Sequence, residues 1–137
     1  MVPTYYLALR HETPETFFKR FFFSHSHDNS ILAVSEGLAD GAAVDSLIYD
    51  FFSVKRPDLT RKTIVVEKST PYGIPPVVVH PKMDLETKEK LKAIFWSIHQ
   101  DPVGKACLEK LQIDRFEPGD DGNYDTVREL QAYLKEK

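Results

Sequence analysis

Residues 24–46 read SHSHDNSILAVSEGLADGAAVDS, and this stretch decides the predicted fold. Its polar start contains Ser26, a favourable helix N-cap, and its middle contains Gly37, which can adopt the left-handed backbone that ends a helix. A helix is therefore expected over about residues 27–36. Residues 39–44 are apolar and bounded by turn residues, which favours a short buried strand.

Further strands are predicted on both sides of this stretch. The aromatic run at residues 17–23 suits a pleated, half-buried surface, and the β-branched run at residues 63–67 does so too. Residues 77–79 add a short valine strand. Four short strands among several helices indicate an α/β chain with too little sheet for a complete doubly wound domain.

Three helices are predicted in the second half of the chain from their capping residues. Asp84 is an N-cap for a helix over about residues 85–99, and Asp101 before a proline begins another over about residues 102–112. Asp125 is expected to cap a last amphipathic helix.

Several polar side chains follow the predicted strands. In open α/β sheets, ligands bind beyond the carboxyl ends of the strands, where helix N-termini offer free N–H groups to an anion. The residues expected at that edge are His25, Ser26, His27, Asp45 and Ser46. Imidazole, hydroxyl and amide donors suit a tetrahedral oxyanion, because they form hydrogen bonds without a full counter-charge.

The overall composition excludes several classes of protein. The chain has 137 residues and a formal net charge of -3, and it lacks the basic surface expected of a nucleic-acid-binding protein. No apolar run approaches the length of a membrane span, and the first twenty residues lack the apolar core of an export signal. Cys107 is the single cysteine, so an internal disulfide is excluded, and its side chain is expected to be buried.

A set of motifs in order along the chain resembles a known family. They are residues 17–20, 24–28, 31–34, 37–46, 76–79, 101–104, 111–113 and 116–120, with Tyr124 and Asp125. In that order and spacing they resemble the C-terminal part, about half, of the phosphate/phosphite/phosphonate substrate-binding proteins of ABC transporters. The resemblance implies an α/β fold, a partial type II periplasmic-binding-protein fold with a mostly parallel sheet and flanking helices.

The resemblance also implies a division of the chain. Residues 1–68 would be a portion of the second lobe without its first strand, and residues 75–137 would be the C-terminal part of the first lobe. Residues 69–74 would be the hinge or crossover between them, in agreement with the cluster of prolines there. The family's oxyanion-binding serine loop would precede Met1, so weak binding or none is expected of this chain alone.

The family's binding residues correspond to specific positions here. Its histidine corresponds to His27, and its second group of contacts falls at Asp45, Ser46 and Leu47. Certain aminoalkylphosphonate binders carry acidic residues where this chain has Leu47 and Pro75, which argues against a substrate amine held by two carboxylates. The expected ligand-binding residues are His27, Ser26, Asp45, Ser46 and Tyr72.

These expectations amount to a non-enzymatic oxyanion-binding part of a transporter, with an ABC permease as partner and an extracytoplasmic location. No catalytic group, metal site or cofactor is predicted. A ligand-sensing part of a signalling protein, or an excised fragment, is the first alternative. A metal-dependent enzyme built on His25, His27 and Asp28 is the second.

His27 and Asp45 could each have a structural role instead of binding a ligand. A separate prediction concerns dimerisation. His27 can be a surface imidazole at a helix start, and Asp45 can cap the next helix or pair with Lys19 or Arg20. An incomplete sheet would leave unpaired edges, which favours a homodimer at high concentration.

Overall fold

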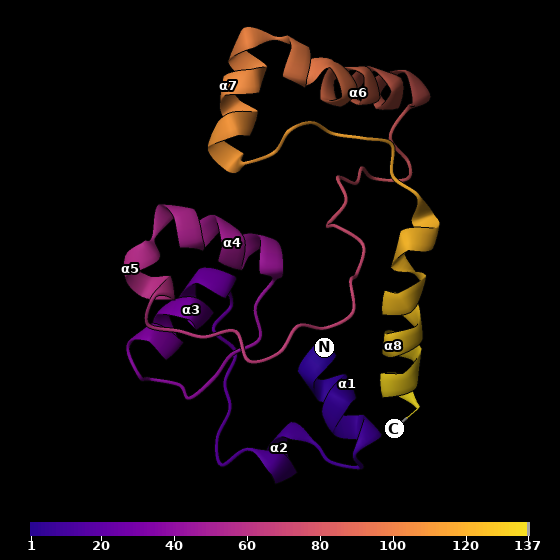
Figure 1. Cartoon of the computed structure of the whole chain (residues 1–137). Coiled ribbons are helices and arrows are strands. Elements are labelled where there is room, and N and C mark those ends of the chain that lie inside the picture. The colour runs from indigo at the N-terminus through magenta and orange to yellow at the C-terminus, as the bar shows by residue number, and fades with distance from the viewer. Residues whose placement is uncertain (137) are drawn as a thin grey trace. The chain divides into compact units, whose positions relative to one another are not determined.

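The computed structural model of the chain describes residues 1–136 (Figure 1). Contacts between residues divide the chain into two compact units. Unit 1 comprises residues 1–72 and the C-terminal segment from Tyr124, and unit 2 comprises residues 73–123. The two units are described separately below.

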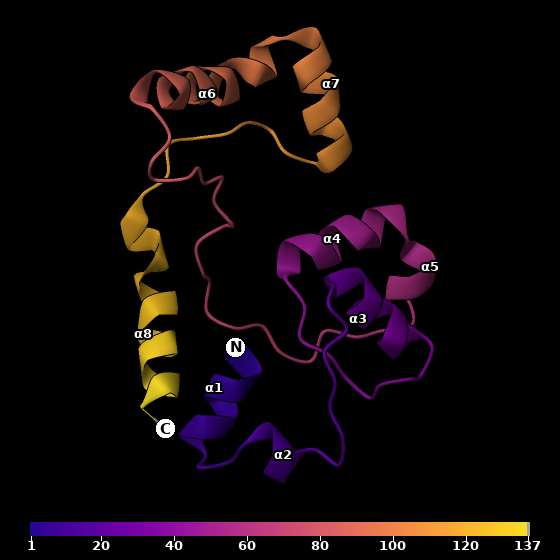
Figure 2. The same ribbon diagram turned by 180° about the vertical axis from the view of Figure 1, so that it is seen from behind.

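Unit 1 contains two groups of helices. The first group is α1 (Val2–Leu9), α2 (Pro14–Phe17) and α8 (Asp125–Lys135). The α1 and α8 helices pack side by side, as both views in Figures 1 and 2 show. Leu7 and Leu130 are buried, and the rings of Tyr5 and Tyr133 meet edge to face with centroids 5.3 Å apart.

The second group in unit 1 carries the predicted site. It consists of α3 (His27–Ser35), α4 (Ser46–Lys55) and α5 (Pro57–Thr60), and each of these helices contacts the other two. Ile31, Ala33 and Leu59 are the buried apolar residues of this group. Burying each of the two larger side chains contributes on the order of 2 kcal/mol, so this small core holds the starts of α3 and α4 in place.

Unit 2 consists of two helices joined by a short 3-10 turn. Its elements are α6 (Leu85–Ser97), the 3-10 turn η1 (Ile98–Gln100) and α7 (Pro102–Leu111), followed by an extended segment and η2 (Asp121–Tyr124), which reaches the boundary of the unit. Leu108 is buried, and Gly104 lies directly against Ile98. The Phe95 ring also meets Phe116 edge to face, with centroids 4.9 Å apart.

The predicted helix boundaries are confirmed where a capping side chain sets them. Ser26 caps α3, and Gly37 beyond its end has a φ of 73°. Asp84 Oδ1 accepts a hydrogen bond from the Thr87 amide at 2.8 Å, and Asp101 caps α7. The last predicted helix is present as α8, but Asp125 is its first residue and Tyr124, not Asp125, is its N-cap.

The predicted sheet is wrong. Among residues 1–136 the structure has no strand, so the α/β fold with a mostly parallel sheet, and with it the partial type II periplasmic-binding-protein fold, is not found. The four segments predicted as strands are mostly extended connections instead, apart from the first residue of the aromatic run, which ends α2. The chain is helical with long extended connections.

The physical reason is that a strand needs a partner. Residues 64–70 make no backbone–backbone hydrogen bond, and the β-branched side chains there face water: Ile64 is 84% exposed and Val66 is 86% exposed. Val78 in the other valine-rich segment is 78% exposed. The preference of such residues for strands reflects packing on a neighbouring strand, and no neighbour is in place here.

Two further sequence expectations can be compared with the structure. The side chain of Cys107 was expected to be buried, but it is exposed on α7. No helix in residues 1–136 combines the length and the apolar character that a membrane crossing requires. The boundary between the units falls inside residues 69–74, and the assignment of the units to lobes stays a prediction.

Candidate anion-binding site

The start of α3 is held by a network of short polar contacts. Ser26 Oγ accepts a hydrogen bond from the Asn29 amide at 3.4 Å, which is the capping interaction. The Ser24 hydroxyl donates to the Ser26 carbonyl at 2.8 Å and lies 2.7 Å from the Ser30 hydroxyl. Between them, His25 has a φ of 64°, a backbone conformation that is uncommon for a residue with a side chain. The loop before α3 therefore has a defined geometry.

The start of α4 is capped by Asp45. This residue is the N-cap of the helix, and its Oδ1 accepts a hydrogen bond from the Leu47 amide at 2.8 Å. The capping alternative for Asp45 is thus what the structure contains. Among the described residues Asp45 forms no ion pair with Lys19 or Arg20. One carboxylate oxygen remains for another hydrogen-bond donor.

A single hydrogen bond joins the two helix starts. The backbone N–H of Asp45 donates to Nδ1 of His27 at a distance of 3.2 Å, across 18 positions of sequence. His27 and Ser46 are exposed, and Ser26 and Asp45 are half-buried. The structure therefore brings together four of the residues selected from the sequence, at the N-termini of two helices that pack on each other.

The helix starts also present backbone donors. The N–H groups of His27, Ser46 and Ile48 have no acceptor among residues 1–136. Such groups, together with the positive end of each helix dipole, favour an anion. Two carboxylates lie in the same region, because Asp28 is in the first turn of α3 and Asp45 precedes α4.

The Ser26 side chain also affects the carboxyl group of Asp28. A hydrogen bond from the Ser26 side chain is the largest cause that lowers the pKa of the Asp28 carboxyl below its usual value. Asp28 is therefore a carboxylate at neutral pH. The hydroxyl of Ser26 is shared between Asp28 and the cap of α3, so it would have to turn in order to donate to a ligand.

Tyr72 is the selected residue that the structure does not bring to this cluster. It is half-buried, and its charged form would lie close enough to Tyr6 to contribute, after desolvation, to raising the pKa of Tyr6. This places Tyr72 beside α1.

The structure also bears on the metal-site alternative. Among the described residues no group of three or more histidine, cysteine, aspartate or glutamate side chains is arranged to hold a metal ion. The geometry therefore gives no support to a metal centre built on His25, His27 and Asp28.

Sequence reasoning missed two features of the site. One is the backbone N–H of Asp45 as the partner of His27, for which no local signal exists, because the two residues lie on different helices. The other is the contact between Ser26 and Asp28, which the spacing of an N-cap and a first-turn acidic residue could have indicated.

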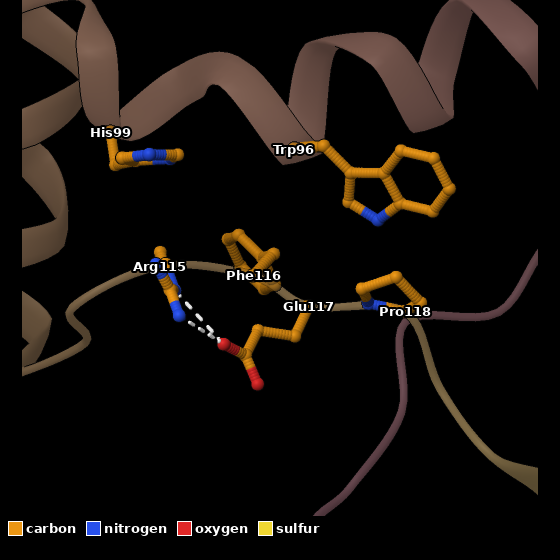
Figure 3. A pocket seen from close by; sticks show the side chains of 6 residues that line it. All are labelled: Trp96, His99, Arg115, Phe116, Glu117 and Pro118. Carbon is orange, nitrogen blue, oxygen red and sulfur yellow. Dashed lines mark hydrogen bonds and ion pairs between the residues drawn. The ribbon is translucent and has the colours of Figure 1, made fainter.

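Two hollows lie outside this cluster. One, of about 560 Å³, is in unit 2 (Figure 3) and is lined by Trp96, His99, Arg115, Phe116, Glu117 and Pro118. Its charged groups are already paired, because Nε and Nη2 of Arg115 donate to Glu117 Oε1 at 2.9 and 2.6 Å. The other, of about 630 Å³, is in unit 1, next to α2, and is lined by Thr4, Ala8, His11, Glu12, Thr13, Pro14, Glu15, Phe21, Phe23 and Leu134. Neither hollow is lined by a residue selected from the sequence.

Comparison with known proteins identifies the family. No curated protein matches the chain. The family described as "ABC transporter, phosphonate, periplasmic substrate-binding protein" matches residues 1–124, which is most of the chain. This family consists of binding proteins, not enzymes; they act outside the cytoplasm and deliver a phosphonate-type substrate to an ABC permease. The chain belongs to the family of periplasmic substrate-binding proteins of phosphonate ABC transporters.

Proposed function

We propose that this chain binds a small phosphorus oxyanion (phosphate, phosphite or phosphonate) at the N-termini of α3 and α4. The contacts would come from His27, Ser26, Asp45 and Ser46. The hydrogen bond from the Asp45 amide to His27 carries this proposal, because it draws two separate segments into one surface. Family membership supports the phosphorus chemistry.

The donors at this surface suit an oxyanion. The unpaired N–H groups of His27, Ser46 and Ile48, the second ring nitrogen of His27 and the Ser46 hydroxyl are available to phosphoryl oxygens. Hydrogen bonds to an ionised acceptor are about twice as strong as neutral ones. Because His27 and Ser46 are exposed, water competes for these groups, and modest affinity is expected.

Asp45 would provide selectivity among oxyanions. Its carboxylate accepts hydrogen bonds and donates none, so it can bind the proton of a P–OH group. Sulfate has no such proton at neutral pH and would be repelled. The acidic residues that would hold a substrate amine are absent at Leu47 and Pro75, which supports a ligand without a bound amine.

The binding proposal is tested by titration calorimetry with phosphate, phosphite, methylphosphonate and sulfate at one ionic strength. At least one of the three phosphorus oxyanions is expected to bind with a Kd on the order of 1 mM, equivalent to about -4 kcal/mol. Sulfate is expected to bind at least about tenfold more weakly, because it cannot donate to Asp45. Failure of all three phosphorus oxyanions to bind, or tighter binding of sulfate, would refute the proposal.

Self-association is a further part of the proposal, although the predicted route through sheet edges is unavailable without strands. The support is now the exposed β-branched side chains of Ile64, Val66 and Val78, which a second chain could cover. Analytical ultracentrifugation is expected to show an average mass that rises with protein concentration. A constant monomer mass up to the highest soluble concentration would contradict this part and leave the binding proposal unaffected.

A further inference from the structure

The hydrogen bond between α3 and α4 determines where the His27 proton is. A backbone N–H is always a donor, so Nδ1 of His27, which receives it at 3.2 Å, must be the acceptor. An imidazole nitrogen that accepts a hydrogen bond carries no proton. In the conformation of this structure His27 is therefore neutral, and its single N–H group is on Nε2.

The charges around His27 come from both helix starts. On α3 the neighbour is Asp28, in the first turn of the helix, and at the start of α4 it is Asp45, whose Oδ1 accepts a hydrogen bond from the Leu47 amide. His27 forms no ion pair among residues 1–136. Among residues 1–136 neither carboxylate forms an ion pair with a cationic side chain.

We infer that His27 meets its ligand as a neutral imidazole that donates only through Nε2, and that the Asp45 backbone amide is the positioning group that fixes this tautomer. The inference rests on the proposed function and makes it more specific. A neutral donor beside two carboxylates suits an oxyanion with one negative charge and a P–OH group. A fully ionised dianion would meet two negative charges without a cationic side chain to balance them.

The tautomer is tested directly by NMR of the whole chain with nitrogen-15 in its histidines. In the free protein, His27 is expected to show an unprotonated Nδ1 and a protonated Nε2. Addition of methylphosphonate is expected to shift the Nε2–H signal and to leave the tautomer unchanged. An imidazolium, or an Nδ1–H tautomer, in either state would overturn the inference.

The role of the Asp45 amide is tested by two variants, of which one keeps the backbone N–H at this position and the other lacks it. Asp45 has φ -66° and ψ 132°, which proline adopts without strain. Asp45→Ala and Asp45→Pro both lose the carboxylate, but only the proline variant also loses the N–H. The His27 spectrum of Asp45→Ala is expected to match the wild type, whereas Asp45→Pro is expected to show both tautomers. Identical spectra for the two variants would refute the positioning role.

The ligand contact is tested with His27→Asn. The asparagine oxygen can take the place of Nδ1 as acceptor, but nothing replaces the Nε2 donor. Binding of the phosphorus oxyanion is expected to weaken at least about tenfold, with little change in stability. His80→Asn is the matched control, because His80 Nδ1 also accepts a backbone N–H at 3.2 Å, from Lys82 in unit 2. It is expected to bind like the wild type.

The outcomes separate the inference from the proposed function. If His27→Asn binds as tightly as the wild type, donation from Nε2 is refuted while oxyanion binding stands. If the wild-type protein binds none of the phosphorus oxyanions, the proposed function and the ligand contact fall together. In that case the spectrum of the free protein still decides the tautomer.

Discussion

Replacing Asp45 with asparagine is expected to abolish most of the discrimination between phosphorus oxyanions and sulfate. Asparagine caps a helix as well as aspartate does, so the hydrogen bond to the Leu47 amide and the start of α4 should remain. The backbone N–H that binds His27 is unaffected. What changes is the second carboxylate oxygen, an acceptor with negative charge, which becomes a neutral amide donor.

The ratio of the phosphonate and sulfate affinities is expected to fall about tenfold or more, or about 1.4 kcal/mol, as one charge-assisted acceptor is lost. Titration calorimetry of both anions measures this ratio, and urea unfolding checks that stability changes by less than about 0.5 kcal/mol. Asp58→Asn, in the short helix α5, is a control for the change in net charge alone, since Asp58 pairs with Arg56. An unchanged ratio in Asp45→Asn would remove the selectivity role of Asp45.

Replacing Gly104 with alanine is expected to destabilise unit 2 strongly. A Cβ atom at Gly104 would lie 2.3 Å from the backbone oxygen of Ile98 and 2.5 Å from Ile98 Cγ1. Real Cβ atoms do not approach so closely, so α7 would have to move away from η1. Overpacking of this kind costs about 1–3 kcal/mol and occasionally more, and because both close contacts are with Ile98, one of them with its backbone, we expect a cost at the upper end, of which the roughly 1 kcal/mol that alanine gains over glycine within a helix offsets only a part.

Trp96 is the single tryptophan and lies on α6, so its fluorescence during urea unfolding reports on unit 2. Gly119→Ala is the matched control in the same unit, because a Cβ atom there meets nothing within 4 Å. That variant is expected to differ from the wild type by less than about 0.5 kcal/mol. Equal stability of the Gly104 and Gly119 variants would show that α7 does not pack on η1 as described.

The helices α3, α6 and α7 could be predicted from the sequence because their signals are local. Ser26, Asp84 and Asp101 each accept a hydrogen bond from an amide three residues ahead, and Gly37 supplies the backbone conformation that ends α3. These interactions lie within one turn of helix and depend little on the rest of the chain. The family could also be identified, because its motifs are spread over most of the sequence.

The absence of a sheet from the described residues could not be predicted, because strand pairing is not local. Residues 63–67 have the composition of a strand, but a strand forms only when another is placed beside it. The site could be predicted only in part. His27 and Asp45 were selected from the sequence, but the atoms that join them belong to segments 18 positions apart, and only the structure specifies them.

The backbone N–H groups of residues 64–70 have no acceptor among the described residues, which has a consequence for how the molecule behaves in solution. Amide protons without an intramolecular acceptor exchange with deuterium as fast as those of a free peptide, with no unfolding step first. A protease can bind the same extended backbone directly. This segment is therefore where cleavage of the native protein should begin, while the helices on either side are still folded.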